Sequence, residues 1–106
     1  MSKVTDNYQI YLEATEKAAI AAAKLRGNGD GVAADKAATD AMRSVLKNSK
    51  ILTRVVIGEG ERDDAPMLFI GEELGNKSSN LKIDIAVDPL ECTNHCAKDL
   101  PDALAV

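Results

Sequence analysis

The sequence predicts a layered α/β protein. Its first half carries apolar residues at three- and four-residue spacing, the repeat of amphipathic helices. Its second half contains two short runs rich in β-branched residues, "RVVIG" (54–58) and "KIDIAV" (82–87), which are typical of strands. Helices followed by strands along one chain favour a sheet that packs against helices.

The first predicted helix covers residues 6–26. Its inward face is predicted to carry Tyr8, Leu12, Thr15, Ala19 and Ala22. Gly27 follows the last periodic residue and suits a C-terminal cap, because glycine adopts a left-handed backbone without strain. The segment "GNGDG" (27–31) then reads as a tight loop.

The second predicted helix covers residues 32–48, and Asp30 is placed to cap its start. Its inward face is predicted to carry Ala34, Ala38, Ala41, Met42 and Val45. Strand 54–58 follows, and an acidic turn, "EGERDD" (59–64), comes after it.

A third helix is predicted over residues 65–74, because Pro66 suits a first helical turn and Gly75 suits its end. After strand 82–87, "LAV" (104–106) looks like the start of a further strand, inside which the sequence stops. A sheet interrupted there would have an unpaired edge. We therefore expect the 106 residues to be the front part of a larger protein and to be marginally stable alone.

Composition excludes several classes of function. The net charge of −4 offers no basic surface for a nucleic-acid partner. No stretch is apolar and long enough to span a membrane, so no membrane partner is expected. Two cysteines without a secretion signal predict a reduced, cytoplasmic protein.

Acidic residues gather directly after the two predicted strands. Strand ends that face the same way bring such groups into one crevice, where a cation must offset their repulsion. Carboxylate oxygens suit Mg²⁺ or Mn²⁺, and two such ions would make a site for phosphoryl transfer. The acids are Glu59, Glu61, Asp63 and Asp64 after the first strand, Asp88 and Glu91 after the second, and Asp35 in the second helix. A solvated acidic loop at 59–64 remains an equal alternative at this point.

The stretch "ECTNHCAK" (91–98) raises a zinc alternative. A structural zinc site needs four Cys or His ligands, and the whole sequence offers three, namely Cys92, His95 and Cys96, so a zinc site fails on ligand count unless two chains share the ion. The favoured interpretation is two small buried thiols and a surface histidine.

Three segments resemble the class II fructose-1,6-bisphosphatases, within the lithium-sensitive sugar and inositol phosphatase superfamily. The segment "VVIGEGERDDAPMLFIGEELG" (55–75) resembles the signature of that family. The segment "DIAVDPLECT" (84–93) resembles its "DIAVDP(I/L)EGT", and "GNGDGVAADKAATDAMR" (27–43) resembles its "GRGDKNAADQAAVDAMR". The similarity covers only the N-terminal part of the longer family members.

The resemblance implies a layered sugar-phosphatase-type fold, truncated after the first strands of the sheet. It implies Mn²⁺- or Mg²⁺-dependent hydrolysis of the 1-phosphate of fructose 1,6-bisphosphate in gluconeogenesis, and action on sedoheptulose 1,7-bisphosphate in some members. By motif, Asp35 and Glu59 would bind one metal ion, and Asp88 and Glu91 the other. A family-like homo-oligomer is also implied.

By the same resemblance, Glu91, Cys92 and Thr93 would contact the substrate phosphate, and Thr93 with Asp35 would orient the attacking water. Glu61 and Asp63 would support the site. The chain departs from the family pattern at Gly31, where members carry a lysine, and at Cys92, where they carry a glycine. These departures predict weak or absent activity for the isolated chain and leave a second hypothesis open, a non-catalytic metal- or phosphate-binding module or docking subunit.

Overall fold

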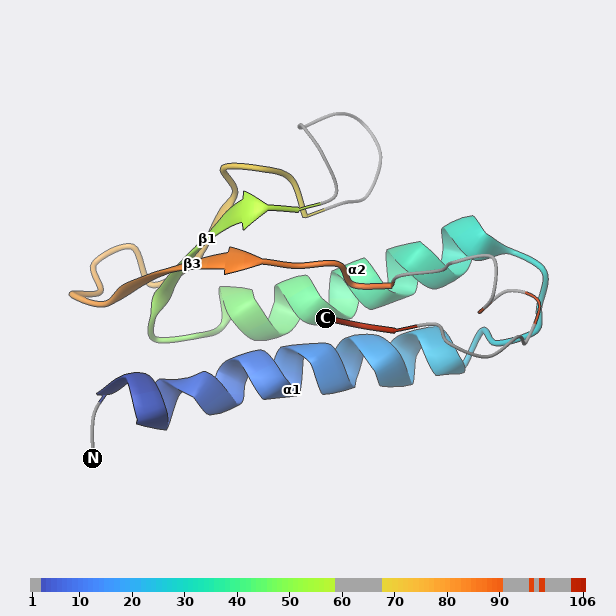
Figure 1. Cartoon of the computed structure of the whole chain (residues 1–106), viewed down its shortest axis with the longest axis horizontal. Coiled ribbons are helices and arrows are strands. Elements are labelled where there is room, and N and C mark those ends of the chain that lie inside the picture. Colours follow the sequence, from blue (N-terminus) through green and yellow to red (C-terminus); the bar gives the residue numbers. More distant parts are fainter. Residues whose placement is uncertain (1–2, 59–67, 91–95, 97, 99–103) are drawn as a thin grey trace.

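The structure is a computed structural model that describes residues 3–58, 68–90, 96, 98 and 104–106, with side chains described from residue 8 onward. Two helices lie side by side and a small sheet packs against them (Figure 1). The elements are α1 (Lys3–Ala23), α2 (Gly31–Lys47), β1 (Leu52–Ile57), β2 (Glu73–Gly75) and β3 (Lys82–Ala86). The predicted α/β class is confirmed.

The start of α2 agrees with the prediction. Asp30 has an extended backbone and its side chain accepts a hydrogen bond from the backbone N–H of Ala33, at 3.0 Å. The buried face carries Ala34, Ala38, Thr39, Met42 and Leu46. Three of the five predicted inward residues are therefore buried, while Ala41 and Val45 lie half-buried beside the helix contact.

The predicted inward face of α1 is wrong at three of its five positions, while Ala22 is buried as predicted and Thr15 is half-buried. Tyr8 and Leu12 are 57% and 48% exposed, and Ala19 is exposed as well. The face that reaches the core carries Ala14, Ala18 and Ala22, together with the half-buried Tyr11. Alanine lies on most sides of this helix, so apolar periodicity alone does not identify the buried side. The helix also ends at Ala23, and turns, not helix, lead to Gly27.

Tyr11 ties α1 to the middle strand. Its hydroxyl is hydrogen-bonded to the hydroxyl of Thr53, with 2.8 Å between the two oxygens. Burial raises the pKa of Tyr11, and the hydrogen bond with Thr53 partly offsets the rise. The phenol therefore stays neutral in the folded chain over a wider pH range than in water.

The strand order in the sheet is β2-β1-β3. β1 is antiparallel to β2 and parallel to β3, with Leu52 paired with Lys82 at the start and Ile57 with Ala86 at the end. Both predicted strands are confirmed, with β1 beginning two residues earlier than expected. Of the third predicted strand, Leu104 forms a single bridge, and Val106 exchanges two backbone hydrogen bonds with Asp88 (2.8 and 3.0 Å).

The helix predicted over 65–74 is wrong for the residues that the structure describes. Residues 68–72 form a loop and turn, and Glu73–Gly75 pair with β1 as β2. Backbone bonds fold this loop onto β1: the N–H of Gly71 donates to the carbonyl of Val55 (2.7 Å), and the N–H of Val55 donates to the carbonyl of Glu72 (2.9 Å). Sheet pairing has therefore overridden the local helical pattern.

Two glycines shape this segment by different means. Gly71 has φ of +92°, and an added Cβ there would meet open space. Gly75 has φ of +104°, and an added Cβ would collide with the backbone carbonyl of Ile51. Gly75 therefore requires glycine for both its backbone conformation and its close approach to the residue before β1.

Among the described residues, no helix is long and apolar enough to cross a membrane. The buried core joins α1, α2, β1, β2, the loop residue Leu68 and the two described C-terminal contributors, Leu90 and Cys96.

Candidate metal and phosphate site

The carboxyl ends of β1 and β3 lie at one edge of the sheet. The two strands run parallel, and the backbone N–H of Val87 donates to the carbonyl of Ile57 at 2.8 Å. Gly58 and Asp88 therefore follow neighbouring, like-directed strands. Ligand sites of open α/β sheets form in the same place, outside the carboxyl ends of adjacent strands.

Asp88 is held by its backbone and by its side chain. Its N–H and carbonyl both pair with Val106, and its Oδ1 accepts a hydrogen bond from the N–H of Leu90 at 3.2 Å. Pro89 and Leu90 behind it are buried, while Asp88 itself is half-buried. The carboxylate thus sits on a fixed backbone at the edge of the core and keeps access to solvent.

Asp35 lies in the N-terminal half of α2 and is half-buried. α2 runs in the opposite direction to β1 and β3, so its beginning lies toward the carboxyl ends of these strands (Figure 1). Asp35 and Asp88 consequently belong to the same end of the molecule. Their elements share the core, because Ala34, Ala38 and Leu90 are members of one buried cluster.

Most of the predicted site lies outside the described residues. Glu59, Glu61, Asp63, Glu91, Cys92 and Thr93 all fall in the undescribed segments, as does His95. Within the part of the chain that is described, no three His, Cys, Asp or Glu residues gather as a potential metal centre. The predicted ligand set therefore remains a prediction.

Cys96 is a buried structural residue. Its side chain is 7% exposed, its Sγ lies 3.6 Å from the carbonyl oxygen of Ala22, and its own carbonyl accepts from the N–H of Gly27 at 2.9 Å. These contacts hold the residue against the end of α1. The interpretation of this cysteine as a small buried thiol is confirmed.

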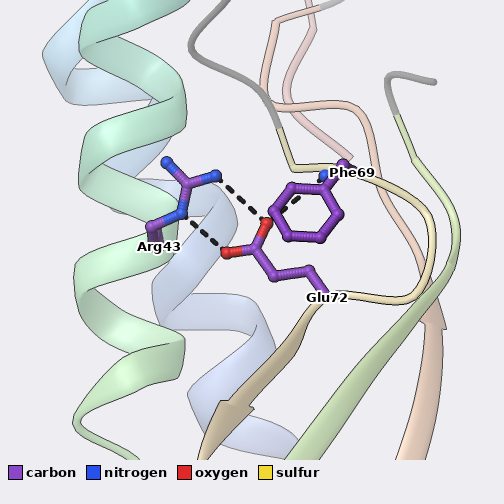
Figure 2. Close-up of polar contacts among 3 residues, drawn as sticks. All are labelled: Arg43, Phe69 and Glu72. Carbon is purple, nitrogen blue, oxygen red and sulfur yellow. Dashed lines mark hydrogen bonds and ion pairs between the residues drawn. The ribbon is translucent and has the colours of Figure 1, made fainter. Parts of the chain in front are cut away.

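An ion pair that the sequence analysis missed holds the loop before β2. Arg43 on α2 donates from Nε to Oε2 of Glu72 at 2.9 Å and from an Nη to Oε1 at 3.1 Å (Figure 2). The backbone N–H of Phe69 also donates to Oε1, at 3.3 Å. The side chains of Arg43 and Glu72 are 28% and 10% exposed. The sequence did contain a signal for this ion pair: Glu72 lies inside the largely apolar run "MLFIGEEL" (67–74), and an acid that is buried with such a run needs a partner of opposite charge.

A layered α/β chain with acids after neighbouring parallel strands has the architecture of the sugar-phosphatase class. The chain belongs to the family described as bacterial fructose-1,6-bisphosphatase, glpX-encoded, whose model matches residues 7–106.

Curated relatives support the same assignment. A D-fructose 1,6-bisphosphatase class 2/sedoheptulose 1,7-bisphosphatase of Thermosynechococcus vestitus is 49% identical over 90% of this chain and 30% of its own length. Proteins of the same name from Synechococcus elongatus and Prochlorococcus marinus are 48% and 51% identical, over 90% and 92% of this chain. The chain spans about 30% of the length of these relatives.

Proposed function

We propose that these residues form the N-terminal, metal- and phosphate-binding portion of a cytoplasmic fructose 1,6-bisphosphatase. The reaction is hydrolysis of the 1-phosphate of fructose 1,6-bisphosphate, a step of gluconeogenesis. The relatives' names pair this activity with sedoheptulose 1,7-bisphosphatase activity, and we include both sugar bisphosphates in the substrate class. The whole enzyme is proposed to be a homo-oligomer, as the family resemblance implies.

The carboxyl edge shared by β1 and β3 carries this proposal. The bond between Val87 and Ile57 brings the ends of the two strands together, and Asp88 follows one of them on a fixed backbone. Hydrolysis of a phosphate monoester needs concentrated charge at the transferring group, and acids at a common strand edge can hold the cations that supply it.

The donor chemistry fits Mn²⁺ or Mg²⁺, since the assigned side chains are all carboxylates and both ions prefer oxygen ligands. Asp35 and Glu59 are assigned to one ion, and Asp88 and Glu91 to the second. When bound, such ions polarise the phosphate and help to form the attacking hydroxide. The Asx-type bond from Leu90 to Asp88 fixes one carboxylate oxygen and so orients the group.

The remaining roles follow the family motif. Segment 91–93 is assigned to the substrate phosphate, with the Thr93 hydroxyl as one donor. Asp35 and Thr93 orient the attacking water, and Glu61 and Asp63 add negative charge around the cations. The matched region is about 30% of the relatives' length. The groups that position the sugar are therefore proposed to lie elsewhere in the enzyme.

A chimera tests the proposal. Residues 1–106 replace the matching segment of the Synechococcus elongatus relative, and Mn²⁺-dependent phosphate release from fructose 1,6-bisphosphate is measured. Asp88→Asn should lower kcat/KM by about 100-fold, because a charged group at the reaction centre is lost. Asp40→Asn is the matched control: it removes the same charge from an exposed position on α2, where only an exposed ion pair with Lys36 is lost, and it should leave kcat/KM within about twofold of the parent.

Equal kinetics for Asp88→Asn and Asp40→Asn would contradict the assignment of Asp88 to the metal site. A chimera that binds Mn²⁺ by calorimetry, with binding lost in Asp88→Asn, yet releases no phosphate would favour the non-catalytic module instead. Residues 1–106 alone should show no useful turnover, because they match about 30% of the relatives' length and the groups that position a sugar bisphosphate are proposed to lie outside that match.

A further inference from the structure

We propose that Arg43 and Glu72 are positioning residues for the metal-binding edge of the sheet. Their ion pair holds the loop before β2 on α2, and this loop fixes the last residues of β1. The pair acts through the backbone of β1. The inference rests on the proposed function for the presence of a metal ion at this edge, whereas the support itself is built from described residues.

β1 contains a bulge just before its end. Val55 pairs with Ile85 and Ile57 pairs with Ala86, so Val56 is an additional residue of β1 without a counterpart on β3. Bulges bend a strand, and they are common beside active sites, where they change the direction of the chain and its side chains. The bulge therefore sets the direction in which β1 leaves the sheet.

The loop before β2 holds β1 on both sides of this bulge. The N–H of Val55 donates to the carbonyl of Glu72, and the carbonyl of Val55 accepts from the N–H of Gly71. After the bulge, Gly58 lies so close to the carbonyl of Leu68 that an added Cβ would collide with it. A shift of the loop must therefore move the end of β1 with it.

The carboxylate of Glu72 closes the loop and fastens it to α2. Its Oε1 accepts from the N–H of Phe69 at 3.3 Å, while the N–H of Glu72 donates to the carbonyl of Phe69 at 3.1 Å. Both carboxylate oxygens also accept from the guanidinium of Arg43 (Figure 2). A planar guanidinium bonded at two points fixes the orientation of a carboxylate as well as its distance, which a lysine ammonium does not.

α2 carries a second residue of the proposed site. Asp35 belongs to the same helix as Arg43. It is assigned to one metal ion together with Glu59, which follows Gly58 in the sequence and lies outside the described residues. The two assigned ligands thus come from different elements, and their separation depends on how the end of β1 is held relative to α2. The ion pair links these two elements.

A Mn²⁺ titration of the chimera tests the positioning role. Arg43→Lys keeps the charge but loses the two-point contact, so the Mn²⁺ concentration at half-maximal phosphate release should rise about tenfold, as should the Kd for Mn²⁺ from calorimetry. Arg43→Met should raise both at least as much. Loss of a positive charge by itself favours cation binding, so this direction distinguishes positioning from a direct charge effect.

Two control variants separate this effect from other losses. Lys82→Met removes an ion pair with Glu73 that is 47% and 38% exposed and lies at the start of β3, away from the carboxyl edge. Leu46→Ala removes a buried side chain near the end of α2 and lowers stability without touching the ion pair. At a temperature below the melting transition of each variant, both should leave Mn²⁺ half-saturation within about twofold of the parent.

Hydrogen exchange on residues 1–106 alone gives a measurement that needs no activity. In Arg43→Lys, the amides of Val55, Gly71 and Val87 should exchange at least about tenfold faster relative to the amides of α1. These amides bond within the loop contact and at the carbonyl of Ile57, so they report on the end of β1.

Equal acceleration in α1 would indicate a general loss of stability and would overturn the proposal. Unchanged Mn²⁺ half-saturation in both Arg43 variants, or the same change in Leu46→Ala, would overturn it as well. A parent chimera that neither binds Mn²⁺ nor releases phosphate would count against the proposed function, and hydrogen exchange would then decide alone whether the pair fixes the end of β1.

Discussion

The ion pair between Arg43 and Glu72 should contribute measurably to the stability of the chain. Removing one partner of a buried, hydrogen-bonded charge pair costs about 3–5 kcal/mol, whereas exposed pairs contribute about 0–1 kcal/mol. Glu72 is nearly buried and Arg43 is about a quarter exposed. Arg43→Met keeps most of the stem and leaves the carboxylate with the Phe69 N–H, so we expect a loss of about 2–3 kcal/mol.

A double-mutant cycle isolates the pair. Arg43→Met, Glu72→Gln and the double variant are compared by urea denaturation monitored by circular dichroism. The coupling energy should be at least about 1.5 kcal/mol, which is the range of close, partly buried charge pairs. In thermal scans, the single Arg43 variant should melt roughly 10–20 °C lower for a chain of this size.

The chain offers its own control. Lys36 and Asp40 form an ion pair with 2.7 Å between Nζ and Oδ2, but their side chains are 59% and 52% exposed. The same cycle on this pair should give about 0.3–0.5 kcal/mol despite the shorter contact. If both cycles give the same small value, burial does not strengthen the Arg43 pair and the reasoning is wrong.

Three further predictions concern single positions. Tyr11→Phe should destabilise the chain by about 1 kcal/mol in urea denaturation, while Tyr8→Phe should not. Because the pKa of Tyr11 is raised in the folded chain, the stabilisation from the neutral phenol is complete below about pH 10 and is lost as pH rises through the folded pKa. The urea midpoints of the wild type and Tyr11→Phe should therefore converge in alkali. Gly75→Ala should cost more than Gly71→Ala, about 3 kcal/mol against about 1, in the same denaturation assay, since only the former collides with backbone. Cys92→Gly in the chimera should raise kcat/KM, since a glycine permits close approach to phosphate; an unchanged or lower value would contradict this.

Local chemistry predicted α2 and the two main strands. The cap at Asp30 and the β-branched run in β1 are signals contained within a few residues. α1 was predicted as a helix, but Tyr8, Leu12 and Ala19 were wrongly placed on its buried side, where only Ala22 was correct. Its many alanines carry little directional information, and the choice of face depends on long-range contacts such as the bond between Tyr11 and Thr53.

The helix prediction for residues 68–75 failed for a related reason. The run "LFIGEELG" has helical spacing, yet its backbone pairs with β1 and its buried acid pairs with an arginine 29 residues earlier. No local rule contains that partner. For the site, the sequence correctly placed Asp88 directly after a strand that runs parallel to β1, and the ligand roles of Asp35 and Asp88 stay predictions.

The loop before β2 connects the unpredicted ion pair with the predicted site. α2 holds the side chain of Glu72 through Arg43. The N–H of Gly71 and the carbonyl of Glu72 are both hydrogen-bonded to the backbone of Val55 in β1. The same loop presses the carbonyl of Leu68 against Gly58, so closely that no Cβ fits there. Gly58 precedes Glu59, which is proposed to bind one metal ion together with Asp35. A contact from the C-terminal half of α2 therefore fixes the end of β1, from which Glu59 follows. Because the side chains of Arg43 and Glu72 are only 28% and 10% exposed, this support is partly buried.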